Sequence, residues 1–207
     1  MKTVLPTLLA AACLILSGAP VAEESTAQSQ GLYRLPFADG SSVRVFDDFT
    51  THRPRGRIDL FAVEGREPYR VVAAADGRIM AIQDGYSEQQ SGRAAADCRN
   101  NYVWIAHANG EWTNYSHLAH DSVTRGAKLK VGDTVKAGSY LGNEDAIGCA
   151  MLRHVHFEVA IPDNETPIDG GGFLIDNEGG KRERNPRFCG VAGGTVVKGS
   201  TYRAVPC

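Results

Sequence analysis

Residues 153–159 have the sequence Arg-His-Val-His-Phe-Glu-Val, and this stretch decides how the rest of the chain is interpreted. Apolar and polar residues alternate between Gly148 and Pro162, which predicts a β-strand. Residues i and i+2 of a strand point to the same face, so His154 and His156 project together, about 7 Å apart. One imidazole can bind a metal ion while its neighbour contacts the water or substrate on that ion. Two polar residues on a solvated face would give the same pattern, so the other histidines and acids must decide.

The start of the chain has the pattern of a secretory signal peptide. Lys2 supplies a positive charge, residues 4–16 are mostly apolar, and Ala22 ends the segment at a plausible cleavage point. The apolar run is too short for a comfortable membrane span, and no later stretch is apolar enough to be one. We therefore predict an exported protein, periplasmic or secreted, with residues 1–22 as signal peptide and residues 23–30 as a flexible leader.

Four cysteines follow the predicted signal peptide: Cys98, Cys149, Cys189 and Cys207. An even number of cysteines in an exported chain predicts disulfide bonds rather than thiol chemistry. Four cysteines allow three pairings, and we favour Cys98–Cys149 with Cys189–Cys207 because each couples a loop to its expected neighbour. A four-cysteine zinc site is disfavoured, because the cysteines are scattered and no C-x-x-C occurs.

The length and charge of the chain limit the classes of function. The 207 residues suffice for one domain with a substantial core, which we assign to residues 31–207, with a core of 35–162 and a tail of 163–207. The formal net charge is −2, and loss of the signal peptide makes it more negative. This balance argues against a protein that binds nucleic acid or an anionic membrane by charge. We expect a monomer.

Short strands and turns dominate the predicted secondary structure. Asp76-Gly77 and Asn109-Gly110 are dipeptides of the hairpin type and stand between strand-like runs. Residues 69–83 and 102–117 are therefore each predicted to form a hairpin. No stretch has the length and periodicity of an amphipathic helix. Together these features predict an all-β domain of antiparallel sheets, with long loops.

Five residues are candidates for chemistry: His52, Asp59, His117, His154 and His156. Catalytic zinc commonly has three protein ligands and one open position for water. Two imidazoles and one carboxylate suit Zn²⁺, which lowers the pKa of the bound water towards neutrality. Further histidines can accept a proton or stabilise charge on a substrate oxygen. The five groups are enough for both tasks, although their spacing alone does not bring them together.

Residues 113–118, Thr-Asn-Tyr-Ser-His-Leu, together with His154-Val155-His156-Phe157, resemble the zinc metallopeptidases of the lysostaphin, LytM and β-lytic type. The resemblance extends from about residue 35 to residue 159 and includes residues 130–138, in the order that the family has. Leu35-Pro36-Phe37, combined with a disulfide-bonded tail, is most similar to the staphylolytic and β-lytic branch.

The resemblance implies a fold of antiparallel sheets that form a groove, with peptidoglycan peptides as the substrate. It assigns one Zn²⁺ per chain to His52, Asp59 and His156, and catalysis to His117 and His154. The roles of general base and oxyanion stabiliser stay open between these last two histidines. The bond that is cut also stays open, because Gly-Gly bridges and D-amino-acid cross-links both fit.

Three features depart from the family's pattern. Arg55 stands four residues before Asp59, where the compact form has a histidine, so that His52 must act from seven residues away. Leu152-Arg153 replaces a Gly-Pro pair and could narrow the groove. Residues 23–30 are too short for the pro-region usual in secreted members. The alternative function is a non-catalytic relative that binds peptidoglycan or activates another hydrolase, although such relatives usually lose metal ligands.

Overall fold

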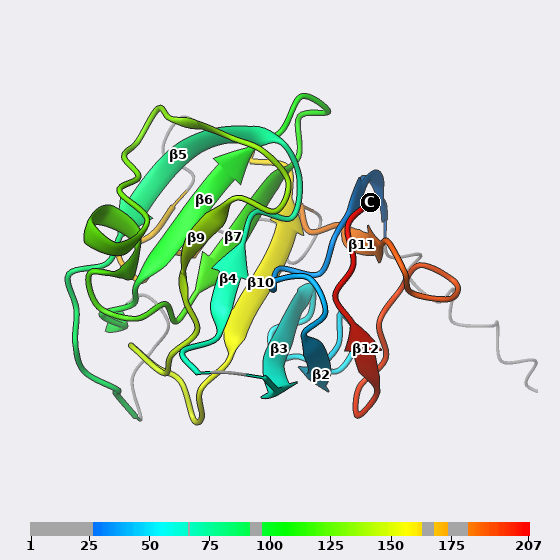
Figure 1. The fold of residues 1–207 in the computed structure, drawn as a ribbon, viewed down its shortest axis with the longest axis horizontal. Coiled ribbons are helices and arrows are strands. Elements are labelled where there is room, and N and C mark those ends of the chain that lie inside the picture. The colour runs from blue at the N-terminus through cyan, green and yellow to red at the C-terminus, as the bar shows by residue number, and fades with distance from the viewer. Residues whose placement is uncertain (1–26, 66, 92–96, 163–167, 174–181) are drawn as a thin grey trace, which may run out of the picture.

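The fold is built on one large antiparallel sheet. The computed structural model describes residues 27–65, 67–91, 97–162, 168–173 and 182–207. The strands of the large sheet are β2 (Ser42–Asp47), β3 (Arg57–Glu64), β5 (Gly77–Gln83), β6 (Tyr102–Ala106), β7 (Trp112–Ser116), β8 (Thr134–Val135), β10 (Val155–Ala160) and β12 (Thr201–Arg203). Their order is β12-β2-β3-β10-β7-β6-β5-β8, which places β10 in the interior of the sheet (Figure 1). The predicted all-β fold of antiparallel sheets is confirmed.

Two smaller sheets complete the fold. β4 (Arg70–Val72) and β9 (Tyr140–Asn143) pair antiparallel and lie in front of the large sheet in Figure 1. β1 (Gln28–Tyr33) and β11 (Asn185–Phe188) form a parallel pair. The helical turn at Ser122–Gly126 is short, and no helix among the described residues is long and apolar enough to cross a membrane.

The core lies on the side of the large sheet that faces β4 and β9. β10 pairs with β3 and β7, so that Phe157 stands opposite Ile58 and Tyr115, and all three side chains are buried. The Phe157 ring contacts Tyr115 and Phe188 at centroid distances of 5.4 and 5.8 Å. Burial of each such side chain contributes about 1.5–3 kcal/mol. Because a strand alternates, the intervening residues of β10 must face the other side of the sheet.

One of the two predicted hairpins is confirmed and the other is wrong. β6 and β7 pair across Asn109-Gly110, where Gly110 has φ +82°. In the described residues, β4 pairs with β9 instead of β5, and β5 pairs with β6 and β8. The Asp76 carboxylate accepts hydrogen bonds from Lys136 Nζ and Ala137 N, both at 2.8 Å. These bonds tie the turn before β5 to the segment after β8, which explains the change of partner.

The predicted disulfides, Cys98–Cys149 and Cys189–Cys207, are both confirmed. The predicted leader is wrong at its end, because residues 28–30 belong to β1. This part of β1 is also held by the side chain of Glu111, whose carboxylate accepts hydrogen bonds from Ser29 Oγ at 2.8 Å and Gln30 N at 2.9 Å. The predicted signal peptide and the first residues of the leader lie outside the described residues.

Candidate active site

The sheet places Asp59 directly beside His156. The two residues are opposite one another in the β10–β3 pairing, on the face turned away from the core. Asp59 Oδ1 lies 3.1 Å from His156 Nδ1 and 3.4 Å from His154 Nε2. All three side chains are buried, with His154 and His156 only 7% and 4% exposed. Burial this deep does not fit the alternative of two polar residues on a solvated strand face.

His52 comes from an irregular loop between β2 and β3 and still reaches this carboxylate. Its Nε2 lies 3.4 Å from Asp59 Oδ2. His52, Asp59 and His156 each offer one candidate ligand atom. These three atoms lie within 4.8 Å of one another. The structure therefore brings together the three residues that the sequence suggested as metal ligands, in spite of the unusual spacing of His52.

The chemistry and spacing of these donor atoms fit a zinc ion. Ligands at 2.0–2.1 Å around a tetrahedral ion are separated from one another by about 3.3–3.4 Å. The carboxylate of Asp59 stands 3.1 Å from the His156 nitrogen and 3.4 Å from the His52 nitrogen. Two imidazole nitrogens and one carboxylate leave a fourth tetrahedral position for water.

His117 follows the end of β7 and faces the same cluster. Its ring lies 4.7 Å from the His154 ring and 6.0 Å from the His156 ring, centroid to centroid. Its backbone has φ 65°, a left-handed conformation that is uncommon for a residue with a side chain. The conformation is held because His117 N donates to Asn100 Oδ1 at 3.1 Å and its Nδ1 bonds to Ile147 O at 2.8 Å.

Three of the four histidines in the cluster have Nδ1 bonded to a backbone carbonyl. Nδ1 of His52, His117 and His154 lies 2.7, 2.8 and 2.8 Å from a backbone carbonyl. A carbonyl only accepts, so each Nδ1 carries the hydrogen in the neutral ring, and Nε2 keeps its lone pair. An Nε2 with a free lone pair can bind a metal or take up a proton, and backbone bonds fix its direction.

Burial and mutual contacts shift the titration of the cluster. Burial alone would raise the pKa of Asp59, but its contacts with His154, His156 and His52, in which Nε2 of His154 and His52 donates when these rings are protonated, outweigh burial and hold this pKa well below its usual value. Burial, with repulsion from His154 and His156, holds the pKa of His117 well below its usual value. Burial also lowers the pKa of His156 to about 4, despite its bond to Asp59. Asp59 is therefore a carboxylate and these two rings are neutral near pH 7, the states that metal binding and proton uptake require.

The cluster opens into a cavity of about 620 Å³. The sequence did not single out several residues that line it, among them Phe46, Arg57, Met151 and Phe173. Arg57 could have been found, because it lies two residues before Asp59 on the same strand and so shares its face. The apolar lining residues lie in segments without a recognisable motif.

Phe173 is placed over the site by a docked loop. Its ring lies 5.2 Å from the His156 ring. Trp104 Nε1 donates to Gly172 O at 2.9 Å, and the Tyr102 ring packs so closely on Gly172 that a Cβ there would lie 2.1 Å from it. The buried indole and the missing side chain of Gly172 therefore set the position of the aromatic wall beside the site.

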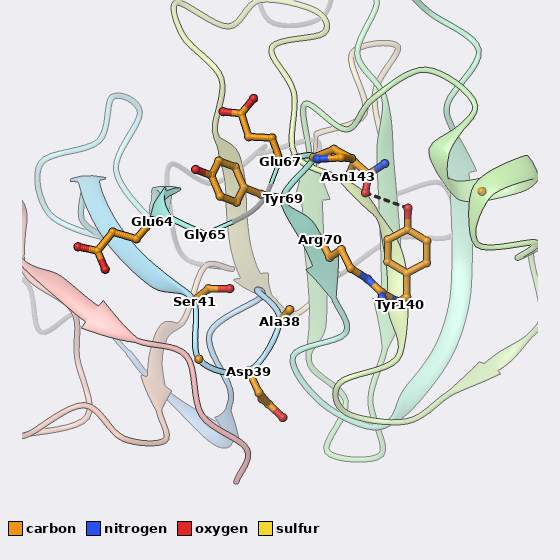
Figure 2. Close-up of a pocket in the computed structure, with 13 residues that line it drawn as sticks. Ala38, Asp39, Ser41, Glu64, Gly65, Glu67, Tyr69, Arg70, Tyr140 and Asn143 are labelled. Atoms are coloured by element: carbon orange, nitrogen blue, oxygen red, sulfur yellow. Dashed lines mark hydrogen bonds between the residues drawn. The ribbon is translucent and has the colours of Figure 1, made fainter.

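A larger cavity, of about 870 Å³, lies elsewhere and is lined by none of the five candidate residues. Figure 2 shows Tyr140 and Arg70 along one wall of it, with the guanidinium carbon 4.5 Å from the ring centroid. Tyr140 Oη donates to Asn143 at 2.9 Å. The acidic residues that line this larger cavity already have partners, such as Glu67 with Arg153 at 2.7 Å.

The sequence suggested that Arg153 could narrow the groove. The structure does not bear this out, because Arg153 does not line the cavity beside the histidine cluster. Its guanidinium pairs with Glu67 and lies 4.9 Å from the centre of the Tyr69 ring, and both of these partners line the larger cavity.

The fold and the cluster together define a β-sheet protein with a His-Asp-His group that could hold a metal ion and two further histidines beside it. Residues 53–170, more than half of the chain, match Peptidase family M23. The chain belongs to this family. The match begins one residue after His52, so that histidine is supported by the geometry of the site and not by the family match.

Individual relatives are distant. The cell division protein DipM of Caulobacter vibrioides is 27% identical over 157 residues, which are 74% of this chain and 22% of DipM. The chain thus spans about a fifth of the length of that relative. Among solved structures, the M23 metalloprotease pseudoalterin is 17% identical, covering 85% of this chain and 96% of that one, with a TM-score of 0.48. Lysostaphin from Staphylococcus simulans is 22% identical, covering 59% and 44%, with a TM-score of 0.41. The β-lytic branch stays a prediction.

Proposed function

We propose that this protein is a zinc-dependent endopeptidase that hydrolyses peptide bonds in bacterial cell-wall peptidoglycan, and that it is exported to the periplasm or beyond. The observation that carries the proposal is the convergence of His52, Asp59 and His156, with ligand atoms within 4.8 Å, next to His117 and His154. The substrate class rests on the family resemblance of the sequence, and the peptidase class on membership of family M23.

His52 Nε2, one or both oxygens of Asp59, and His156 would hold the metal. Zn²⁺ in this position supplies a Lewis acid and lowers the pKa of bound water. The protein contributes the fixed direction of each donor, because the β3–β10 pairing orients Asp59 and His156 and the Pro54 carbonyl orients His52. Ligands held in this way need little rearrangement on metal binding.

His117 and His154 would act on the proton and on the substrate oxygen. Both rings present Nε2 to the cluster because Nδ1 is bonded to a backbone carbonyl. A neutral Nε2 can accept the proton of the attacking water, and the protonated ring can then donate to the developing oxyanion or to the leaving amine. Their rings lie 4.7 Å apart and contact one another, so one substrate carbonyl can be within reach of both.

The groove suits an extended peptide with both apolar and charged groups. Phe46, Met151 and Phe173 supply apolar walls, while Arg53 and Lys198 carry positive charge. Met151 is 90% exposed and Phe46 is 38% exposed, so both are available to a substrate. The Arg53 guanidinium is complementary to the free carboxylates of wall peptides, whereas Lys198 Nζ is already paired with Asp47 at 2.7 Å.

Metal analysis combined with digestion of wall fragments tests the proposal. Purified protein should bind about one Zn²⁺, lose activity with a chelator and regain it with zinc. His156→Ala and Asp59→Ala should lose both zinc and cleavage, whereas His120→Ala, at an exposed histidine, serves as the matched control. Fragments with Gly-Gly bridges and with D-amino-acid cross-links, analysed by mass spectrometry, identify the bond. Activity that persists without bound metal contradicts the zinc assignment, and zinc binding without cleavage of either substrate favours the non-catalytic relative.

A further inference from the structure

His52 is the ligand candidate with the least support from the sheet. It lies in the segment between β2 and β3, where no strand pairing fixes the backbone. A ligand in an irregular segment is useful only if the backbone around it is held in one conformation. The bonds that hold this segment therefore matter for the metal site.

Asp48 is the centre of those bonds. Its Oδ1 accepts hydrogen bonds from Thr50 N at 2.9 Å, Thr50 Oγ1 at 2.8 Å and Thr51 N at 2.9 Å. Its backbone oxygen accepts from His52 N at 3.0 Å, and its backbone nitrogen donates to Thr51 Oγ1 at 2.9 Å. The side chain is 9% exposed, so water replaces few of these bonds. The carboxylate thus fixes the turn that leads into His52.

The second oxygen of the same carboxylate joins this turn to the C-terminal tail. Asp48 Oδ2 accepts a hydrogen bond from Lys198 N at 2.9 Å. Lys198 precedes β12, which pairs with β2, and the Cys189–Cys207 disulfide closes this part of the tail. The tail is thereby attached to the loop as well as to the edge of the sheet.

The tail also contacts the far end of the loop. Arg57 Nη2 lies 3.4 Å from Glu183 Oε1. Gly56 has φ +99°, and a Cβ there would lie 2.6 Å from Glu183 Cγ, so only glycine lets the loop pass over this residue. The segment that carries His52 is therefore held by the tail at both ends, at Asp48 and at Arg57.

We propose that Asp48 is a positioning residue for His52, and that the disulfide-closed C-terminal tail completes the metal site by fixing the loop through Asp48. Asp48 does not touch the metal position. It acts by keeping the His52 backbone in the conformation that directs Nε2 at Asp59. The proposal rests on the zinc site of the proposed function.

Asp47 provides a matched control. Its carboxylate also bonds to Lys198, but through the side chain, with Oδ1 2.7 Å from Nζ. Asp47→Asn and Asp48→Asn remove the same charge from adjacent residues that share a partner. Both oxygens of Asp48 accept backbone amides, one from the loop and the other from Lys198, so Asp48→Asn, with one carbonyl oxygen and one NH₂ donor, leaves one of these two sides without its acceptor.

The test measures zinc affinity by competition with a chelator, and amide hydrogen exchange of metal-free protein in peptides that cover residues 48–56. Asp48→Asn should weaken zinc binding by about tenfold or more, the range for groups that orient ligands, and should speed exchange in these peptides. Asp47→Asn should leave exchange at wild type, and because Asp47 lies opposite Asp59 in the β2–β3 pairing, its zinc affinity measures the effect of the lost charge alone, which Asp48→Asn should exceed. A folded Asp48→Asn protein with wild-type affinity and exchange would overturn the proposal.

Two further measurements keep the outcome decisive. If Asp48→Asn does not fold, Thr50→Val decides, because it removes one bond to Asp48 from an exposed residue and should weaken zinc binding by about threefold. Wild-type affinity and exchange in Thr50→Val then overturn the proposal. If wild-type protein binds no zinc, the proposed function fails, while faster exchange confined to Asp48→Asn still supports the role of Asp48 in fixing the loop.

Discussion

The candidate site has a half that lies on strands and a half that lies on loops. Asp59 and His156 are cross-strand neighbours on β3 and β10, and His154 precedes β10 with a bridge to Asp145. His52 and His117 lie in loops, one with an irregular backbone and one with a left-handed φ of 65°. Ladder hydrogen bonds position the strand half, and side-chain to backbone bonds position the loop half.

Each loop histidine is supported from a segment next to a disulfide. His117 bonds to Asn100 and Ile147, which lie two residues from Cys98 and from Cys149. The turn before His52 bonds to the tail that Cys189–Cys207 closes. The comparison teaches that disulfide-linked segments position the histidines of the loop half, as sheet pairing positions the residues of the strand half.

The largest effect should come from replacing the proposed catalytic histidine in each half. His154→Ala and His117→Ala should each lower kcat by about 10²–10⁴, the range for a positioned acid–base group. Zinc content should stay near wild type in both, since neither belongs to the ligand set of His52, Asp59 and His156. Zinc loss in His154→Ala would show that the ligand and the catalytic residue on this strand have been exchanged.

Removing the disulfides one at a time should show which loop histidine each disulfide supports. Cys98→Ser/Cys149→Ser and Cys189→Ser/Cys207→Ser should each lower the free energy of unfolding by about 2–5 kcal/mol. We expect the first pair to reduce kcat more than zinc affinity, because it supports His117. The second pair should reduce zinc affinity, because it supports His52. Denaturant unfolding gives the free energy of unfolding, chelator competition gives the zinc affinity, and kinetics give kcat. If both pairs of substitutions lower the zinc affinity equally, the two disulfides do not support different loop histidines.

A carboxylate far from the site tests whether these effects are local. Glu111 accepts bonds from β1, and Glu111→Gln should lower the free energy of unfolding by about 2 kcal/mol with zinc affinity unchanged. Burial alone would raise the pKa of Glu111, but hydrogen bonds from Tyr33, Gln30 and Ser29 hold it below 4.5. The stabilisation is therefore complete above pH 4.5 and is lost as the pH falls through the folded pKa. Unfolding curves should show the wild-type advantage shrinking below pH 4.5, and a constant difference would contradict the assignment.

The smallest effect should follow from Arg153→Ala. Arg153 lies next to His154 in sequence, but its side chain pairs with Glu67 outside the groove. We expect kcat/KM to change by less than about threefold, and stability by about 0.5–1 kcal/mol, as for an exposed ion pair. A large rise in KM would show that this arginine reaches the substrate after all.

The strand half could be predicted from the sequence because its signal is periodic. Alternation in residues 153–159 indicates that His154 and His156 share a face, and family likeness adds Asp59, as it also adds His52 and His117 of the loop half. The same local reasoning failed at Asp76-Gly77, where contacts with the distant Lys136 and Ala137 outweigh the turn preference.

The supports of the loop half could not be predicted in this way. The bond from Lys198 N to Asp48 joins residues 150 positions apart, and it involves a backbone amide that any residue would supply. Phe173 reaches the site because Gly172 docks on Trp104 and Tyr102, a contact without a local pattern. Such long-range contacts depend on the finished fold and leave no periodic trace in the sequence.

The placement of the disulfides has a consequence for when the protein can act. Thiols stay reduced in the cytosol and oxidise on export. A newly made chain in a reducing compartment could form the sheet and bring Asp59, His154 and His156 together, but the covalent supports of both loop histidines would be missing. Oxidation would then complete the site only after the chain has left the compartment in which it was made. If the protein is the exported wall hydrolase proposed above, it would be inactive at the place of synthesis and would become competent where its substrate is.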